Sequence, residues 1–218
     1  MSRIYPARNA SSDSDSSTIE VNLDDYPRVL TVWNRSSMTF QGTDGFTVFD
    51  GEGKLVFRVD NYSRKNMCLL KGIVLMDGAG KAILTVKPQL LSMQYQWDGY
   101  KGEATCRRSS KTPVFSMRRK LIQRNNEAEI FMGGSIKQGG KPDYTIEGSF
   151  RRRSCSIKGP KGELVALLSR KKVNTTVVLS DDVFTLVVQP RFDSELVMAF
   201  IIVMDRICPR TKGAIMCS

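Results

Sequence analysis

The amino-acid sequence contains no histidine among its 218 residues. Histidine is the usual general base at neutral pH and a common metal ligand, so its absence excludes Ser-His-Asp and Cys-His catalytic arrangements and histidine-rich metal sites. No phosphate-binding loop of the form Gly-x-x-x-x-Gly-Lys-Ser/Thr or Gly-x-Gly-x-x-Gly stands between a strand pattern and a helix pattern. We therefore expect a protein that is not an enzyme and that binds neither a cofactor nor a metal ion.

Paired carboxylates and paired cysteines are also scarce. Asp24-Asp25 and Asp181-Asp182 are adjacent in sequence, and neighbours on a strand face opposite ways, so neither pair forms a catalytic dyad. The chain has five scattered cysteines and no Cys-x-x-Cys pair, which predicts reduced thiols in a cytosolic protein. No apolar run follows a basic segment near the N-terminus, so we expect no secretory signal. The expected location is the cytoplasm, with the plasma-membrane periphery and the nucleus left open.

The beginning of the chain differs from the rest. It is acidic, rich in serine and poor in apolar residues, which is typical of a flexible tail. The sequence therefore predicts a tail over residues 1–25, one barrel domain over residues 26–210 and a short C-terminal tail over residues 211–218.

Short apolar runs bounded by Gly, Asp, Asn and Pro fill most of the domain and predict an all-β fold, a barrel or a sandwich of roughly a dozen strands. Three segments share an apolar run, a turn and a second apolar run. We expect each to be a β-hairpin with Gly53, Gly80 or Gly162 closing its turn. The expected strands are Arg28–Arg35, Phe46–Asp50, Lys54–Asp60, Ile73–Met76, Ala82–Lys87, Pro113–Arg119, Ala128–Met132, Tyr144–Phe150, Glu163–Arg170, Thr176–Leu179 and Phe184–Gln189.

A different pattern follows these strands, where an unbroken apolar run extends from Leu196 to Met204. Asp193 or Ser194 can cap a helix start and Pro209 can end it. At ~1.5 Å per residue the run covers about 14 Å, well short of the ~30 Å hydrocarbon core, so we expect no transmembrane span. A helix that is apolar on every side has to be surrounded, and we expect it inside the β-structure. The expected core residues of this central helix are Leu196, Phe200, Ile201, Val203 and Met204.

Positive charge is abundant and uneven. The net charge is +11, and residues 101–172 hold 18 basic and 6 acidic side chains. Such an excess favours a polyanionic partner: an anionic membrane, a phosphoinositide headgroup or nucleic acid. The alternative interpretation is a generally basic surface without a special partner. Aromatic residues are only 8% and do not interleave with the arginines, so a base-stacking platform has little support.

Basic clusters within this stretch are the candidate binding sites. Alternate residues of a strand share a face, so Arg151 and Arg153 are expected to point together. Arg-Arg-Ser patterns also resemble substrates of basophilic kinases, with Ser109, Ser110 and Ser154 as acceptors. The residues expected to contact a lipid or another polyanion are Arg118, Lys120, Arg151, Arg153, Lys171 and Lys172.

The chain resembles the plant LURP-one-related proteins, whose domain is similar to the tubby C-terminal domain and the phospholipid scramblases. The resemblance covers about Tyr26 to Arg210. The segments that carry it are FTVFDGEGKLVFRVDN (Phe46–Asn61), LMDGAGKAILTVKPQLLSM (Leu75–Met93), YTIEGSFRRRSCSI (Tyr144–Ile157) and FTLVVQPRFDSELVMAFIIVMDRI (Phe184–Ile207).

The resemblance implies a closed barrel of about twelve strands around a central C-terminal helix. It also implies a non-enzymatic role, with tethering through phosphoinositides and a link to plant signalling or defence. No catalytic residues come with it. A protein-interaction adaptor without a lipid ligand and a nucleic-acid-associated, transcription-linked factor remain the alternatives.

Overall fold

A computed structural model describes residues 25–35, 45–59, 72–89, 95–103, 112–120, 127–134, 136, 140–172, 174 and 177–208. These residues form twelve strands and one helix. The elements are β1 (Arg28–Arg35), β2 (Gly45–Phe49), β3 (Leu55–Val59), β4 (Ile73–Asp77), β5 (Ala82–Pro88), β6 (Trp97–Lys101), β7 (Phe115–Arg119), β8 (Ala128–Met132), β9 (Tyr144–Ser149), β10 (Ser154–Lys158), β11 (Leu164–Arg170), β12 (Val183–Val188) and α1 (Ser194–Ile207).

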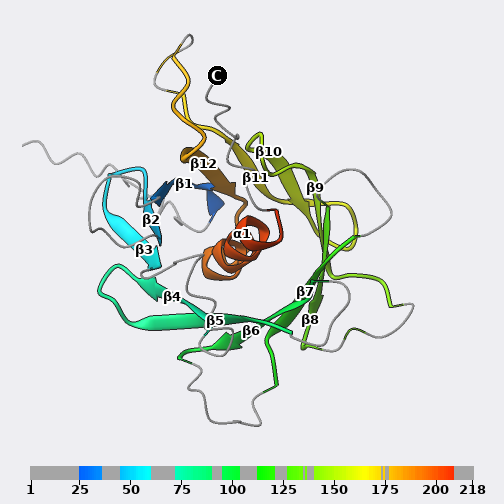
Figure 1. Ribbon diagram of the computed structural model, residues 1–218. Coiled ribbons are helices and arrows are strands. Elements are labelled where there is room, and N and C mark those ends of the chain that lie inside the picture. Colours follow the sequence, from blue (N-terminus) through cyan, green and yellow to red (C-terminus); the bar gives the residue numbers. More distant parts are fainter. Residues whose placement is uncertain are drawn as a thin grey trace, which may run out of the picture.

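The strands form one closed antiparallel barrel. Each strand pairs with its neighbour in sequence, and β12 pairs with β1 to close the ring, with Leu30 opposite Leu186. Figure 1 looks along the barrel and shows α1 in its centre, surrounded by the strands. The expected all-β barrel around a C-terminal helix is therefore confirmed. None of the helices in the described residues is long and apolar enough to cross a membrane.

Helix α1 fills the barrel because its side chains from Leu196 to Met204 are all apolar. Phe200, Ile201, Val203 and Met204 are fully buried, and Leu196, at the first turn, is partly buried against the same core. The Phe200 ring meets Phe115 of β7 edge-on, with ring centroids 4.9 Å apart. Truncating a buried Phe to Ala typically costs about 3–5 kcal/mol, so a single ring of this kind contributes a large share of the stability of a domain.

Asp193 fixes the start of α1, as the sequence predicted. Its carboxylate accepts hydrogen bonds from the backbone N–H groups of Glu195 at 2.8 Å and Leu196 at 3.4 Å. These N–H groups have no partner within the helix, and a capping Asp satisfies them. The last helical residue is Ile207, so the helix ends before Pro209.

The barrel has two ends, which we name after the direction of α1. The front end, where α1 begins, carries the tight turns of the β2–β3, β4–β5 and β10–β11 hairpins. The rear end, where α1 ends at Cys208, carries the β9–β10 turn (residues 150–153) and the β11–β12 connection (residues 171–182). The three predicted hairpins are confirmed, and Gly53, Gly80 and Gly162 all have positive φ.

The strand predictions differ from the structure in three places. Strand β6 was not expected, and β10 was expected only as the first arm of a hairpin. The strand expected over residues 176–179 is wrong: in the described part of that segment only an isolated bridge joins Lys172 and Val178. Ser109, Ser110, the tail over residues 1–25 apart from Asp25, and residues 211–218 lie outside the described residues. Ser154, at the start of β10, is exposed.

Candidate anion-binding surface

The six predicted basic residues do not share one surface. Arg118 and Lys120 lie at the outer wall on and just after β7, whereas Arg151 and Arg153 lie in the β9–β10 turn. Lys171 and Lys172 follow β11 at the same end of the barrel as that turn, and Lys172 is exposed. The two turns belong to one surface. Arg118 lies on the wall instead, and Lys120 follows the rear end of β7.

Arg153 points into the barrel, so the expectation that it shares an exposed face with Arg151 is wrong. Residues 150–153 form a turn rather than a strand, and Arg153 has φ +52°, which turns its side chain inward. Only 1% of Arg153 is exposed. Its guanidinium lies between the rings of Phe150 and Phe184, at 4.6 and 4.3 Å from their centroids. A cation held between two aromatic faces is stabilised by their quadrupoles and is inaccessible to a lipid headgroup.

The charge of Arg153 is compensated by the end of the helix. A terminal guanidinium nitrogen lies 3.9 Å from Oδ1 of Asp205, which is also 1% exposed, and Nδ2 of Asn34 donates to the same oxygen at 3.2 Å. Nε of Arg153 donates to the backbone carbonyl of Asp181 at 2.9 Å. This cluster connects α1, β1 and both rear turns. Removing one member of a buried ion pair commonly costs about 3–5 kcal/mol.

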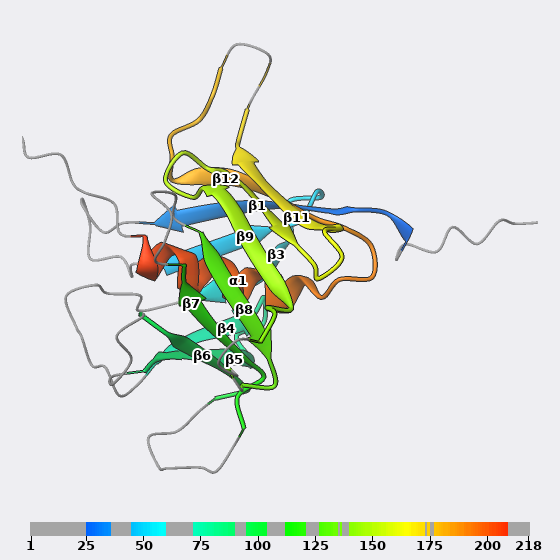
Figure 2. The same cartoon turned by 90° about the vertical axis from the view of Figure 1, so that its right-hand side faces the viewer.

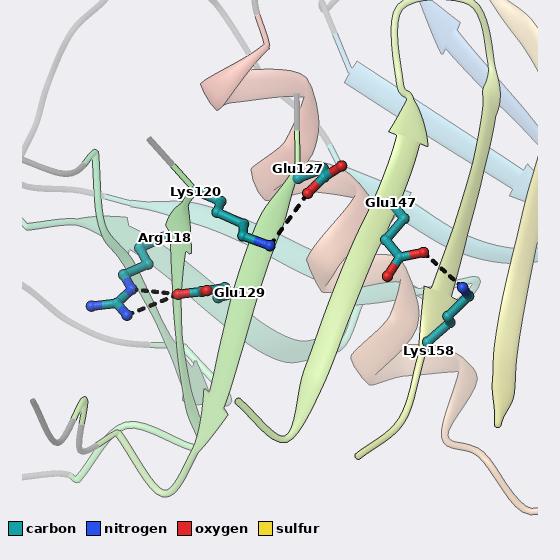
Figure 3. A network of polar contacts seen from close by, with 6 residues as sticks. All are labelled: Arg118, Lys120, Glu127, Glu129, Glu147 and Lys158. Atoms are coloured by element: carbon teal, nitrogen blue, oxygen red, sulfur yellow. Dashed lines mark hydrogen bonds and ion pairs between the residues drawn. The ribbon is translucent and has the colours of Figure 1, made fainter. Parts of the chain in front are cut away.

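Arg118 and Lys120 lie on a wall where acids neutralise the bases. Figure 3 shows three ion pairs across strands β7 to β10: Arg118 with Glu129 at 2.8 Å, Lys120 with Glu127 at 3.6 Å, and Lys158 with Glu147 at 2.7 Å. Each such pair is worth about 0–1 kcal/mol to stability because water screens it. Their larger effect is that the wall presents alternating charges instead of a continuous basic patch.

The exposed bases of the rear end gather around Asp181. Its carboxylate pairs with Arg170, while its carbonyl receives the bond from Arg153, so the two rear turns are tied to each other. Nζ of Lys171 donates to Oγ1 of Thr31 across the neighbouring strand at 3.1 Å. We call the following residues the rear basic cluster: Arg151, Arg152, Arg170, Lys171 and Lys172.

The front end is also charged, but its signs are mixed. The tight turns there place Lys54 beside Asp50 and Glu52, and Lys81 beside Asp77. Both Asp side chains accept hydrogen bonds from backbone N–H groups of their own turns, at 2.8 to 3.0 Å. These carboxylates shape the turns and lie within four residues of the lysines, so the described front turns carry both signs of charge.

The two cysteines that the structure describes are buried free thiols, Cys155 on β10 and Cys208 after α1. Burial raises the pKa of Cys155 to about 12, despite the opposing effect of Arg153. Burial likewise raises the pKa of Cys208 to about 11, against the effect of Arg119 and Arg151. A thiol nucleophile acts as the thiolate, so both groups are inert at neutral pH.

Sequence reasoning missed two buried carboxylates. Asp205 compensates the charge of Arg153. The only feature of the sequence that could have indicated this role is the position of Asp205 at the end of an apolar run. Asp98 of β6 is 3% exposed and accepts hydrogen bonds from Ser116 Oγ at 2.6 Å, Gln89 Nε2 at 2.8 Å and Gln96 Nε2 at 3.2 Å. The two glutamines stand at the two ends of the β5–β6 connection, so Asp98 ties these ends to β6 and has a structural role.

Comparison with known proteins shows the family of this chain. The family model described as LURP-one-related matches residues 28–205. Protein LURP-one-related 5 of Arabidopsis thaliana is 38% identical over 182 residues, covering 83% of each chain. Protein LURP-one-related 12 of the same plant is 37% identical over 177 residues, covering 79% of this chain and 75% of that one. An X-ray structure of another Arabidopsis thaliana protein, 19% identical, matches in fold with a TM-score of 0.57 over 84% of this chain and 92% of that one. The chain, a tubby-like barrel around one helix, belongs to the LURP-one-related family.

Proposed function

We propose that this protein is a non-enzymatic binding protein that attaches to anionic membranes, with phosphoinositide headgroups as the preferred ligand. The observation that carries the proposal is the rear basic cluster, in which two turns joined through Asp181 place exposed Arg and Lys side chains at one end of the barrel. The planar fork of arginine suits phosphate oxygens, and lysine adds an unoriented point charge.

Electrostatics sets the expected character of the binding. Each Lys or Arg close to an anionic leaflet contributes about 1 kcal/mol, and the attraction decays within a Debye length of about 8 Å at physiological salt. Four or five bases at one end can therefore hold the protein at a membrane reversibly, and raised salt should release it. Arg153 does not contribute because it is buried, and Arg118 and Lys120 contribute little because they face Glu129 and Glu127.

The biological setting in this proposal comes from the family resemblance. A membrane-attached binding protein of this family would act in plant signalling or defence. The adaptor and nucleic-acid alternatives predict different behaviour. An adaptor would remain in the supernatant with every vesicle, and a transcription-linked factor would bind DNA with sequence selectivity at physiological salt.

The test is co-sedimentation with neutral vesicles and with vesicles containing a phosphoinositide, at low and at physiological salt. The rear variant replaces Arg151, Arg152, Lys171 and Lys172 with Ala. The front variant replaces four exposed lysines at the other end and removes the same charge: Lys54, Lys81, Lys101 and Lys161. We expect salt-sensitive, phosphoinositide-dependent binding that the rear variant loses and the front variant largely keeps. Wild-type-level binding by the rear variant would overturn the proposal.

A further inference from the structure

The described parts of the connection between β11 and β12, residues 171–172 and 177–182, extend beyond the barrel. Figures 1 and 2 show these two arms projecting from the ring of strands in two perpendicular views. Its described part exposes two large apolar side chains, Val177 at 48% and Val178 at 42%. Lys171 and Lys172, both in the rear basic cluster, stand at its base. Two adjacent exposed valines above a pair of lysines are unlike the other described connections of the barrel.

Hydrogen bonds fix the described residues of this connection. The backbone N–H of Leu179 donates to the carbonyl of Lys171 at 2.9 Å, and that of Val177 donates to Oδ1 of Asn174 at 2.7 Å. At its return to β12, the carbonyl of Asp182 accepts a bond from the N–H of Asn34 at 2.8 Å. The exposed valines are therefore held in place by a bonded scaffold, and their exposure belongs to the fold.

An exposed tryptophan lies beside the same base. Trp33 of β1 is 46% exposed and stands opposite Val183, the first residue of β12. Lys171 reaches over β12 to Thr31, two residues before Trp33 on the same outward face. The outward positions of β1 and β12 in this region carry no charge: Val29, Thr31, Trp33, Val183, Thr185 and Val187.

We infer that Val177 and Val178 insert into the interfacial region of an anionic bilayer, with Trp33 at headgroup level and Lys171 and Lys172 against lipid phosphates. This inference rests on the proposed function and adds which part of the molecule enters the lipid. Apolar side chains that leave water for acyl chains add an affinity that salt does not screen, and tryptophan favours the bilayer interface. A nucleic acid would provide no apolar environment for the valines, because its phosphates attract only the lysines.

The test separates insertion from electrostatic attachment. Val177→Thr with Val178→Thr keeps the branched shape and removes apolar character, and Leu164→Thr is the control, since Leu164 is 41% exposed at the front end. With phosphoinositide vesicles at physiological salt, we expect the valine variant to bind about tenfold more weakly and the leucine variant to bind as wild type. Thermal unfolding measured without vesicles shows that both variants are folded.

Tryptophan emission supplies an independent readout. The chain has two tryptophans, and Trp97 packs against the core, so a vesicle-induced blue shift should come from Trp33. We expect this shift, and quenching by brominated lipids, in the wild type and neither in Trp33→Phe. Binding that persists unchanged in the valine variant, with no blue shift in the wild type, would overturn insertion and leave membrane attachment standing. A wild-type protein that binds no anionic vesicle would overturn both, and selective DNA binding would support the nucleic-acid alternative.

Discussion

The two ends of the barrel use charge in different ways. At the front end, carboxylates such as Asp50 and Asp77 bond to the backbone of tight turns and lie beside Lys54 and Lys81. At the rear end, Asp181 pairs with the exposed Arg170, whereas Asp205 lies inside the barrel beside the buried Arg153. The described rear turns therefore carry more exposed basic than acidic side chains. A net charge of +11 says little about function until the structure shows which bases are already compensated.

The largest expected change in stability comes from a substitution in α1, the helix that runs between the two ends. Phe200→Asp places a charge without a partner in the centre of the barrel, where desolvation is very costly, and we expect a loss above about 5 kcal/mol, enough to prevent folding. Circular dichroism and soluble yield measure this. The control is Leu196→Asp at the front mouth, where the side chain is only partly buried and the loss should be much smaller. A folded Phe200→Asp protein of unchanged thermal stability would contradict the central helix.

The next effect compares the arginines that contact α1 at each end. Asp205→Ala leaves Arg153 buried without its carboxylate and should cost about 3–5 kcal/mol. Arg28→Met, at the front end, removes one hydrogen bond to Ser194 and a contact with Phe57, and should cost about 1 kcal/mol. Chemical denaturation measures both. Equal losses of unfolding free energy would show that the buried pair is no more important than the contacts of Arg28. Recovery of stability in the double variant Arg153→Met/Asp205→Leu would confirm that the cost of Asp205→Ala comes from an uncompensated charge.

A smaller effect tests the neutralised wall. Glu127→Gln with Glu129→Gln releases Lys120 and Arg118 from their acids and should raise binding to anionic vesicles about two- to fivefold, while stability falls by less than about 2 kcal/mol. The control, Glu52→Gln with Glu103→Gln, makes the same change of net charge at the front end. An equal gain in the control would show that net charge alone governs attachment.

The smallest effect concerns the thiols of the rear end. Their raised pKa values keep Cys155 and Cys208 protonated in the folded state, whereas unfolded thiols ionise above their ordinary pKa of 9.0. Unfolding therefore releases protons at alkaline pH, and stability should fall as the pH rises from about 9 towards 11. In a variant retaining only these two cysteines, we expect no reaction with a thiol reagent at pH 8 until denaturant is added. Fast labelling of the native protein would contradict their burial.

The sequence predicted elements best where local chemistry and tertiary packing agree. The bounds of β1 and β8 match the expectation, since their apolar runs end at clear turn residues, and Asp193 was recognisable as a cap. Strand β6 was missed because Asp98 and Gly99 disfavour strands. Gly99 is needed there because a Cβ would lie 2.1 Å from the Phe115 ring, which is a constraint from another strand.

The candidate site was only partly predictable. Runs of arginine drew attention to the β9–β10 turn, but a run cannot show which member turns inward. Arg153 does so because Phe150, Phe184 and Asp205, from three separate elements, create a place for a cation. The compensation of Arg118 by Glu129 depends on cross-strand register, which also becomes visible only in the folded barrel.

The position of α1 at the end of the element order has a consequence for biosynthesis. The strand that closes the ring, β12, pairs with β1 and is followed directly by the helix that fills the centre. A ribosome-bound chain thus exposes its inward-facing side chains until the last elements have left the exit tunnel. Premature termination before residue 194 would release a chain that lacks α1 and leaves the apolar interior of the barrel exposed. We expect chaperones and proteases to recognise such a chain, which would not be a shortened functional domain.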